Sequence, residues 1–175
     1  MYLQELKIRK LSTRKQLNDF ETGFEAVDEY FHEEAYKRHS ELLTKVYLVT
    51  YEKKLVAFFT LSNDKITLED VENEECWKKF RTAHFPDDTN FVSFSALIIG
   101  YIGVDKRSQS LGIGGYILNH IKAKSKNSSL SGARFLTVNS YREAFDFYLK
   151  NGFDFITEAD NEYDTRLMYF DLLKY

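Results

Sequence analysis

The spacing of apolar residues in the first half of the chain predicts a strand, a helical stretch and a hairpin. Apolar and polar residues alternate over residues 3–11, as they do in a half-buried strand. The runs 46–51 and 55–61, rich in β-branched and aromatic residues, flank the polar turn Glu52-Lys53-Lys54 and predict a β-hairpin. A helical period extends to about His39, and the positions that define it are Phe24, Val27, Asp28, Phe31 and Ala35.

The second half of the chain predicts strands and helices in alternation. The apolar run Phe94–Val104 predicts a buried strand, which a glycine-rich turn and a helix opened by Tyr116 follow. Further along, we expect a strand over Arg134–Val138, a helix over Tyr141–Lys150 that Asn151-Gly152 ends, and closing strands over Phe153–Thr157 and Arg166–Leu172.

Residues 63–93 form a polar, acidic insertion between the hairpin and the buried strand. Within it we expect a helix over Leu68–Arg81 whose packing face is Trp77 and Phe80. The resulting order of elements is β-α-α-β-β-(insert)-β-α-β-α-β-β, with no internal repeat and no linker. This order predicts one mixed α/β domain over residues 1–175.

The glycine-rich turn over residues 109–115 is the strongest chemical signal in the chain. A strand, a glycine turn and a helix N-terminus together present free backbone N–H groups at the positive end of a helix dipole. Such a site suits a phosphate or pyrophosphate. A P-loop is excluded because no Gly-Lys-Ser or Gly-Lys-Thr closes the turn, and Ile117 replaces the third glycine of the dinucleotide fingerprint. The alternative is an ordinary turn without a ligand.

Composition limits the class of protein. The chain has 175 residues, 43% of them hydrophobic and 16% aromatic, with a single proline, which predicts a folded domain. No apolar run is long enough to span a membrane and the first residues lack a signal-peptide pattern, so we expect a cytoplasmic protein. Cys76 is the single cysteine and the four histidines lack metal-ligand spacing; we therefore expect neither a disulfide nor a metal site.

The charge is distributed unevenly along the chain. The net charge is −3, yet residues 101–150 carry eight Lys or Arg against three Asp or Glu. This positive segment includes the glycine turn. Because most nucleic-acid binders are basic overall, the distribution favours a small anionic ligand over a long polyanion.

Two motifs resemble those of the GNAT acyl-CoA-dependent N-acetyltransferases. Gln109-x-x-Gly112-x-Gly114 follows the fourth predicted strand, and Phe147-Tyr148-Leu149-Lys150-Asn151-Gly152-Phe153 follows the fifth, about forty residues later. The resemblance implies a central, mostly antiparallel sheet of about six to seven strands with about four helices. It also implies an inserted helix between the third and fourth strands.

The resemblance implies a role for each matching residue. Ile102, Gly103 and Val104 would pair with the pantetheine arm of acetyl-CoA, and the N–H near Val104 would stabilise the oxyanion. Tyr148 would return a proton to the departing thiolate; a core packing role is the alternative. Asn139 would stand in for an asparagine of the family, which Tyr141 replaces here. Backbone N–H groups would cradle the pyrophosphate at Gln109, Ser110, Leu111, Gly112, Ile113 and Gly114.

Two residues of the turn depart from the family pattern. Many members carry glycine where Ser110 stands, and arginine or lysine near Leu111, so the grip on the pyrophosphate is expected to differ. Cys76 lies far from the turn in sequence, which favours direct acetyl transfer to a primary amine over an acyl-enzyme. The general base stays open between a glutamate and a water relay.

The acceptor amine is open among a small molecule, a peptide and an aminoacyl-tRNA. The N-terminal half resembles the GNAT branch that includes bacterial toxins acetylating the amino acid on charged tRNA. Tyr101 stands where that branch usually has arginine, and the overall acidity argues against RNA. A third hypothesis is a regulatory module that binds acyl-CoA without turnover. A homodimer is compatible with the aromatic content.

Overall fold

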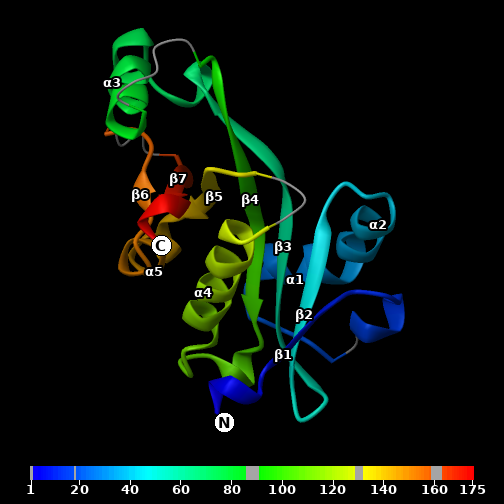
Figure 1. The fold of residues 1–175 in the computed structure, drawn as a ribbon. Coiled ribbons are helices and arrows are strands. Elements are labelled where there is room, and N and C mark those ends of the chain that lie inside the picture. Colours follow the sequence, from blue (N-terminus) through cyan, green and yellow to red (C-terminus); the bar gives the residue numbers. More distant parts are fainter. Residues whose placement is uncertain (1, 18, 86–90, 129–131, 159–162) are drawn as a thin grey trace. The chain divides into compact units, whose positions relative to one another are not determined.

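The computed structural model describes residues 2–17, 19–85, 91–128, 132–158 and 163–175 (Figure 1). Its helices are α1 (Glu25–Glu29), α2 (Ala35–Ser40), α3 (Glu74–His84), α4 (Ile113–Lys126) and α5 (Phe145–Lys150). Its strands are β1 (Lys7–Lys10), β2 (Lys45–Tyr51), β3 (Lys54–Thr67), β4 (Ser93–Val104), β5 (Phe135–Tyr141), β6 (Asp154–Phe155) and β7 (Thr165–Asp171). None of the helices in these ranges combines the length and the apolar character needed to cross a membrane.

The seven strands are hydrogen-bonded in the order β1-β2-β3-β4-β5-β7-β6. The β1–β2, β2–β3, β5–β7 and β6–β7 pairs are antiparallel, whereas β4 and β5 are parallel. The predicted mixed α/β fold with a mostly antiparallel sheet is therefore confirmed, as is the hairpin of β2 and β3. The two turn residues of this hairpin, Glu52 and Lys53, have φ values of 47° and 69°, as a two-residue turn of right-handed strands requires.

The described residues form two compact units, of which the first comprises residues 1–62 and 99–121. A π-helical turn, Tyr30–Glu34, joins α1 to α2 in this unit and produces one helical run close to the predicted one. The turn directs the adjacent Tyr30 and Phe31 inward, and both are buried. The core of this unit consists of Leu11, Leu17, Phe20, Tyr30, Phe31, Ala35, Val46, Leu48 and Phe58.

The second unit comprises residues 63–98 and 122–175. Here β5, β7 and β6 lie side by side, and α3 belongs to the segment that connects β3 to β4 (Figure 1). The parallel contact of β4 with β5 covers three pairs, from Ala96–Phe135 to Ile98–Thr137. Trp77 and Phe80, the predicted packing face of the inserted helix, are buried in a core with Ile66, Phe94, Ala96 and Phe135.

Several predicted boundaries are wrong. The strand expected over residues 3–11 begins at Lys7, because Leu3–Glu5 form a 3-10 turn, and the helix expected to open at Tyr116 begins at Ile113. The inserted helix begins at Glu74 and not at Leu68, because Thr67 and Asp70 form a capping box around a separate 3-10 turn. Tyr141 belongs to β5, where it pairs with Thr165, so the helix expected from Tyr141 begins only at Phe145. The closing strand expected over Phe153–Thr157 is reduced to β6.

Candidate functional site

The glycine turn lies between β4 and α4, as predicted. Asp105 follows β4 directly, and its buried carboxylate accepts a hydrogen bond from the Arg107 N–H at 3.0 Å. This bond starts a short 3-10 turn, Lys106–Ser108, after which Gln109–Gly112 leads into α4 at Ile113. The turn therefore ends at the N-terminus of a helix of 14 residues, where N–H groups lack intrahelical acceptors.

Two residues of this turn have left-handed backbone conformations. The φ angles of Ser110 and Gly112 are 62° and 79°. Left-handed residues between right-handed or extended ones direct successive N–H groups toward a common point, the geometry of an anion-binding nest. No described residue accepts a hydrogen bond from the N–H of Ser110, Leu111 or Gly112. These groups are available to a ligand.

Gln109 holds the turn through its side chain. Its Nε2 donates to the carbonyl oxygen of Thr22 at 2.8 Å and to that of Val104 at 3.2 Å. The resemblance implied only a main-chain role for this residue. The side chain instead links the turn to the end of β4 and to the segment that precedes α1.

The end of β4 is closely packed on one side. A Cβ atom at Gly103 would lie 2.4 Å from Cε1 of Phe58 and 2.9 Å from Cγ2 of Thr22, so only glycine fits. Gly103 is buried, whereas Ile102 and Val104 are half-buried. Packing against the core thus explains Gly103 without any ligand.

The positive charges that precede the turn are paired. Lys106 forms an ion pair with Glu21, and Arg107 donates two hydrogen bonds, both of 2.8 Å, to the Asp105 carboxylate. The Arg107 hydrogen bonds hold the pKa of Asp105 below its usual value. The positive field expected from the sequence is therefore reduced at this place, and the N–H groups of the turn become the principal means of binding an anion.

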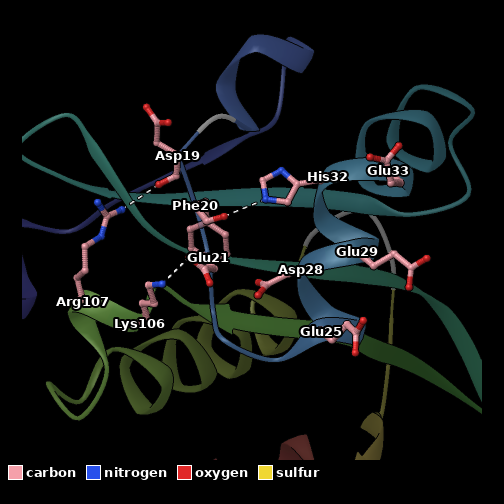
Figure 2. A pocket seen from close by; sticks show the side chains of 10 residues that line it. All are labelled: Asp19, Phe20, Glu21, Glu25, Asp28, Glu29, His32, Glu33, Lys106 and Arg107. Carbon is pink, nitrogen blue, oxygen red and sulfur yellow. Dashed lines mark hydrogen bonds and ion pairs between the residues drawn. The ribbon is translucent and has the colours of Figure 1, made fainter.

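A pocket of about 920 Å³ lies beside α1 in the same unit (Figure 2). Its carboxylates outnumber its cations, Lys106 and Arg107, and belong to Asp19, Glu21, Glu25, Asp28, Glu29 and Glu33. The carboxylate of Asp28 accepts a hydrogen bond from the Thr22 N–H at 2.7 Å, and His32 Nε2 donates one to the Phe20 carbonyl oxygen at 2.9 Å. Such a pocket repels phosphate and suits a cationic group. The four-residue spacing of Glu25, Glu29 and Glu33 was the signal for it in the sequence.

Two further hollows of the first unit have more cationic than anionic side chains among the residues that line them. Their volumes are about 550 and 800 Å³, and both are lined by Gln16 and Lys53. The basic residues around them are Lys7, Arg9, Lys53, Lys54 and Arg107, against the acidic Asp19, Glu52 and Asp105. A surface of this charge attracts anions.

Tyr148 lies on α5 in the second unit and is 7% exposed. Its ring contacts that of Phe153 with a centroid distance of 5.4 Å. Neither a hydrogen bond nor a neighbouring charge from the described residues changes the pKa of its hydroxyl. Burial raises the pKa of Tyr148, so the phenol is protonated at neutral pH and can donate a proton. Gly152, with φ of 79°, ends the helix as predicted.

The predicted site residues are divided between the two units. Ile102, Gly103, Val104 and Gln109–Gly114 lie together in the first unit, and Tyr148 and Asn139 belong to the second. Asn139 is exposed on β5 opposite Leu167.

A buried hydrogen-bond network around His84 was not predicted from the sequence. His84 Nδ1 donates to Asp171 at 3.1 Å, Tyr169 donates to its Nε2 at 3.2 Å, and Arg134 donates two hydrogen bonds to Asp171. The network links α3 to β7, and burial lowers the pKa of His84. No sequence pattern connects residues so far apart in the chain. No cluster of three or more potential metal ligands occurs among the described residues.

A comparison with families of known proteins finds one match. Residues 93–168, which include the glycine turn and α5, match the family described as "Acetyltransferase (GNAT) domain". No curated protein is similar in sequence.

Solved structures of toxin acetyltransferases share the fold. A tyrosine-to-phenylalanine mutant of the AtaT toxin, bound to acetyl-CoA and the C-terminus of the antitoxin AtaR, has a TM-score of 0.72 at 18% identity, over 97% of this chain and 94% of that one. AtaT complexed with acetyl-methionyl-tRNAfMet has a TM-score of 0.72 at 18% identity, over 97% and 96%. A tyrosine-to-phenylalanine mutant of KacT has a TM-score of 0.71 at 17% identity, over 98% and 97%.

Proposed function

We propose that the chain is a GNAT-type acetyltransferase that transfers the acetyl group of acetyl-CoA directly to a primary amine. The observation that carries this proposal is the turn from Gln109 to Gly114, with free N–H groups at the start of α4. A pyrophosphate accepts hydrogen bonds from such groups without needing a lysine or a metal. We assign Ile102, Gly103 and Val104, at the end of β4, to the pantetheine arm, as the resemblance implies.

The reaction requires one bond to form and one to break. The neutral amine attacks the thioester carbonyl, a C–N bond forms, and the tetrahedral intermediate collapses with loss of the C–S bond. The departing thiolate takes a proton, and the new amide nitrogen loses one. We assign the first proton to Tyr148, because burial keeps its phenol protonated and because it lies at the position that the resemblance assigns to the acid.

The test compares the native protein with Tyr148→Phe. Acetyl-CoA binding is measured by calorimetry, and free thiol release is measured with a panel of primary amines, peptides and charged tRNA. We expect equal binding and at least a roughly tenfold lower rate in Y148F, the lower range of what a positioned acid contributes. Equal turnover in the two proteins would remove Tyr148 from the mechanism.

A second outcome of the same experiment separates an enzyme from a binding module. Binding of acetyl-CoA without turnover on any acceptor would favour a regulatory module. Failure to bind acetyl-CoA at millimolar concentration would refute the assignment of the turn itself.

Acetylation of aminoacyl-tRNA is the second candidate function. The basic hollows around Lys53 favour it, since phosphate contacts supply most of the affinity for RNA. Solved AtaT includes a complex with an acetylated aminoacyl-tRNA. The direct check incubates the protein with labelled acetyl-CoA and charged tRNA, and then looks for the acetylated amino acid after hydrolysis. Its absence, with turnover on a small amine, would leave the first candidate alone.

A further inference from the structure

The side chain of Lys122 is buried although it is a lysine. It lies on α4 in the second unit and is 4% exposed, whereas Lys124 and Lys126 of the same helix are exposed. Burial lowers the pKa of Lys122, because removing a charged ammonium group from water costs free energy. Lysine is almost never fully buried without a partner.

The partners of this ammonium group lie after Tyr148 in the chain and on β7. Its Nζ donates a hydrogen bond to the carbonyl oxygen of Asn151, the residue that follows α5. It also lies 4.0 Å from the ring centroid of Phe170 and 5.5 Å from that of Phe153. A cation above two aromatic faces is attracted to both of them.

The residues that Lys122 holds are those that close the helix around Tyr148. The carbonyl oxygen of Tyr148 accepts hydrogen bonds from the N–H of Asn151 at 3.0 Å and from that of Phe153 at 3.1 Å. The Phe153 ring in turn contacts the Tyr148 ring. Lys122 therefore reaches Tyr148 through one main-chain turn and through one aromatic ring.

Stability alone gives a poor reason for a lysine here. An apolar side chain of similar length, such as methionine, would fill the same space without the desolvation cost, and such replacements are often neutral or stabilising. The ammonium instead supplies a directed bond to one carbonyl oxygen. Directed contacts of this kind hold a reacting group within the narrow range of positions that catalysis tolerates.

We propose that Lys122 is a positioning residue that fixes the C-terminal turn of α5 and, through it, the phenol of Tyr148. This inference rests on the proposed role of Tyr148 as the proton donor. It assigns Lys122 no contact with substrate.

A double-mutant cycle tests the inference. Thiol release from acetyl-CoA, with water and with the best acceptor of the amine panel, is measured for Lys122→Met, Tyr148→Phe and the double variant. We expect K122M to lower kcat between about 10- and 100-fold, the range for a misplaced catalytic group, with little change in KM for acetyl-CoA. In the Y148F background the same substitution should change kcat less than about twofold, because residues in one chain of contacts are not additive.

Lys124→Met is the matched control, since it removes an exposed lysine from the same helix. It should keep the native rate. Hydrogen exchange gives a readout without activity: the amides of Asn151 and Phe153 should exchange faster in K122M than in K124M. If K122M does not fold, Phe170→Leu replaces it in the cycle, because this variant removes one aromatic face from the ammonium group. We expect Phe170→Leu to lower kcat in the native background and to change it little in the Y148F background.

The failures of the two proposals can be told apart. Equal falls in kcat in both backgrounds, or a native rate in folded K122M, would overturn the role of Lys122 and leave Tyr148 as the acid. A native rate in Y148F would overturn both roles.

Discussion

Gln109 and Thr22, 87 positions apart in the sequence, are joined by a 2.8 Å hydrogen bond from the side-chain amide of the first to the main-chain carbonyl of the second. This bond and the one to Val104 fix the start of the glycine turn against the end of β4. The turn is thus held by a side chain that leaves its own N–H groups available. Pre-organised donors of this kind bind an anion without first having to be ordered.

Replacing Gln109 should therefore weaken acetyl-CoA binding. Gln109→Ala removes two hydrogen bonds, each worth about 1 kcal/mol, so we expect affinity to fall by up to about 30-fold. Calorimetry measures the change. Gln4→Ala is the control, because this exposed glutamine has no side-chain hydrogen bond to any residue that the structure describes. Native affinity in Q109A would mean that the turn keeps its shape without this anchor.

The backbone at Ser110 predicts a stabilising substitution. Its φ of 62° disfavours any residue with a Cβ, so Ser110→Gly should raise the free energy of unfolding by about 1 kcal/mol. Gly112→Ala, at φ of 79°, should lower it by about 1–2 kcal/mol. Urea denaturation of the two variants checks the opposite signs. A loss of stability in S110G would show that the serine side chain makes a favourable contribution.

The close packing around Gly103 predicts that a larger residue at this position destabilises the fold. In Gly103→Ala the new methyl group would overlap the Phe58 ring, which we expect to cost about 1–3 kcal/mol in thermal unfolding. Gly132→Ala is the control, because an added Cβ there meets nothing within 4 Å. Equal stability of the two variants would mean that Phe58 moves aside without cost.

The network around Asp171 predicts a pH dependence of stability. Burial alone would raise the pKa of Asp171, but hydrogen bonds from Arg134, the Leu173 N–H and His84 outweigh it and lower the pKa to about 2. The folded-state pKa thus lies below the value of 3.8 for an unperturbed aspartate. Ionised Asp171 therefore contributes about 2 kcal/mol to the free energy of unfolding. This contribution is complete above pH 4 and is lost as the pH falls toward 2.

Denaturation at pH 7 and pH 3 checks this prediction. Asp171→Asn should lower stability at pH 7 and reduce the difference between the two pH values. Asp154→Asn removes a carboxylate that is exposed and pairs with Lys174 at 3.7 Å, so it should leave the difference unchanged. An unchanged pH dependence in D171N would place the acid-labile group elsewhere.

Local patterns predicted much of the fold. The β2–β3 hairpin, the turn before α4 and the helix end at Gly152 depend on neighbouring residues, and each was found where the sequence placed it. Tyr141 was misplaced because its helical spacing with Phe145 competes with seven strand pairs between β5 and β7, and tertiary pairing prevails over a weak local preference.

Contacts between residues that are far apart in the sequence could not be predicted from local patterns. Lys122 is one of the positive charges of residues 101–150, although its spacing from Leu118, Ile121 and Ser125 places it on the buried face of α4. The bonds between His84 and Asp171 and between Gln109 and Thr22 each span more than eighty residues. Only the folded chain brings such partners together.

The pairing of Lys106 with Glu21 and of Arg107 with Asp105 has a consequence for the salt dependence of ligand binding. Unpaired cations lose their attraction for a ligand when dissolved ions surround them, whereas main-chain dipoles in contact with a phosphate are screened far less. A binding turn that relies on dipoles retains its co-substrate when ionic strength rises. We therefore expect the proposed binding of acetyl-CoA to be nearly independent of the concentration of potassium chloride.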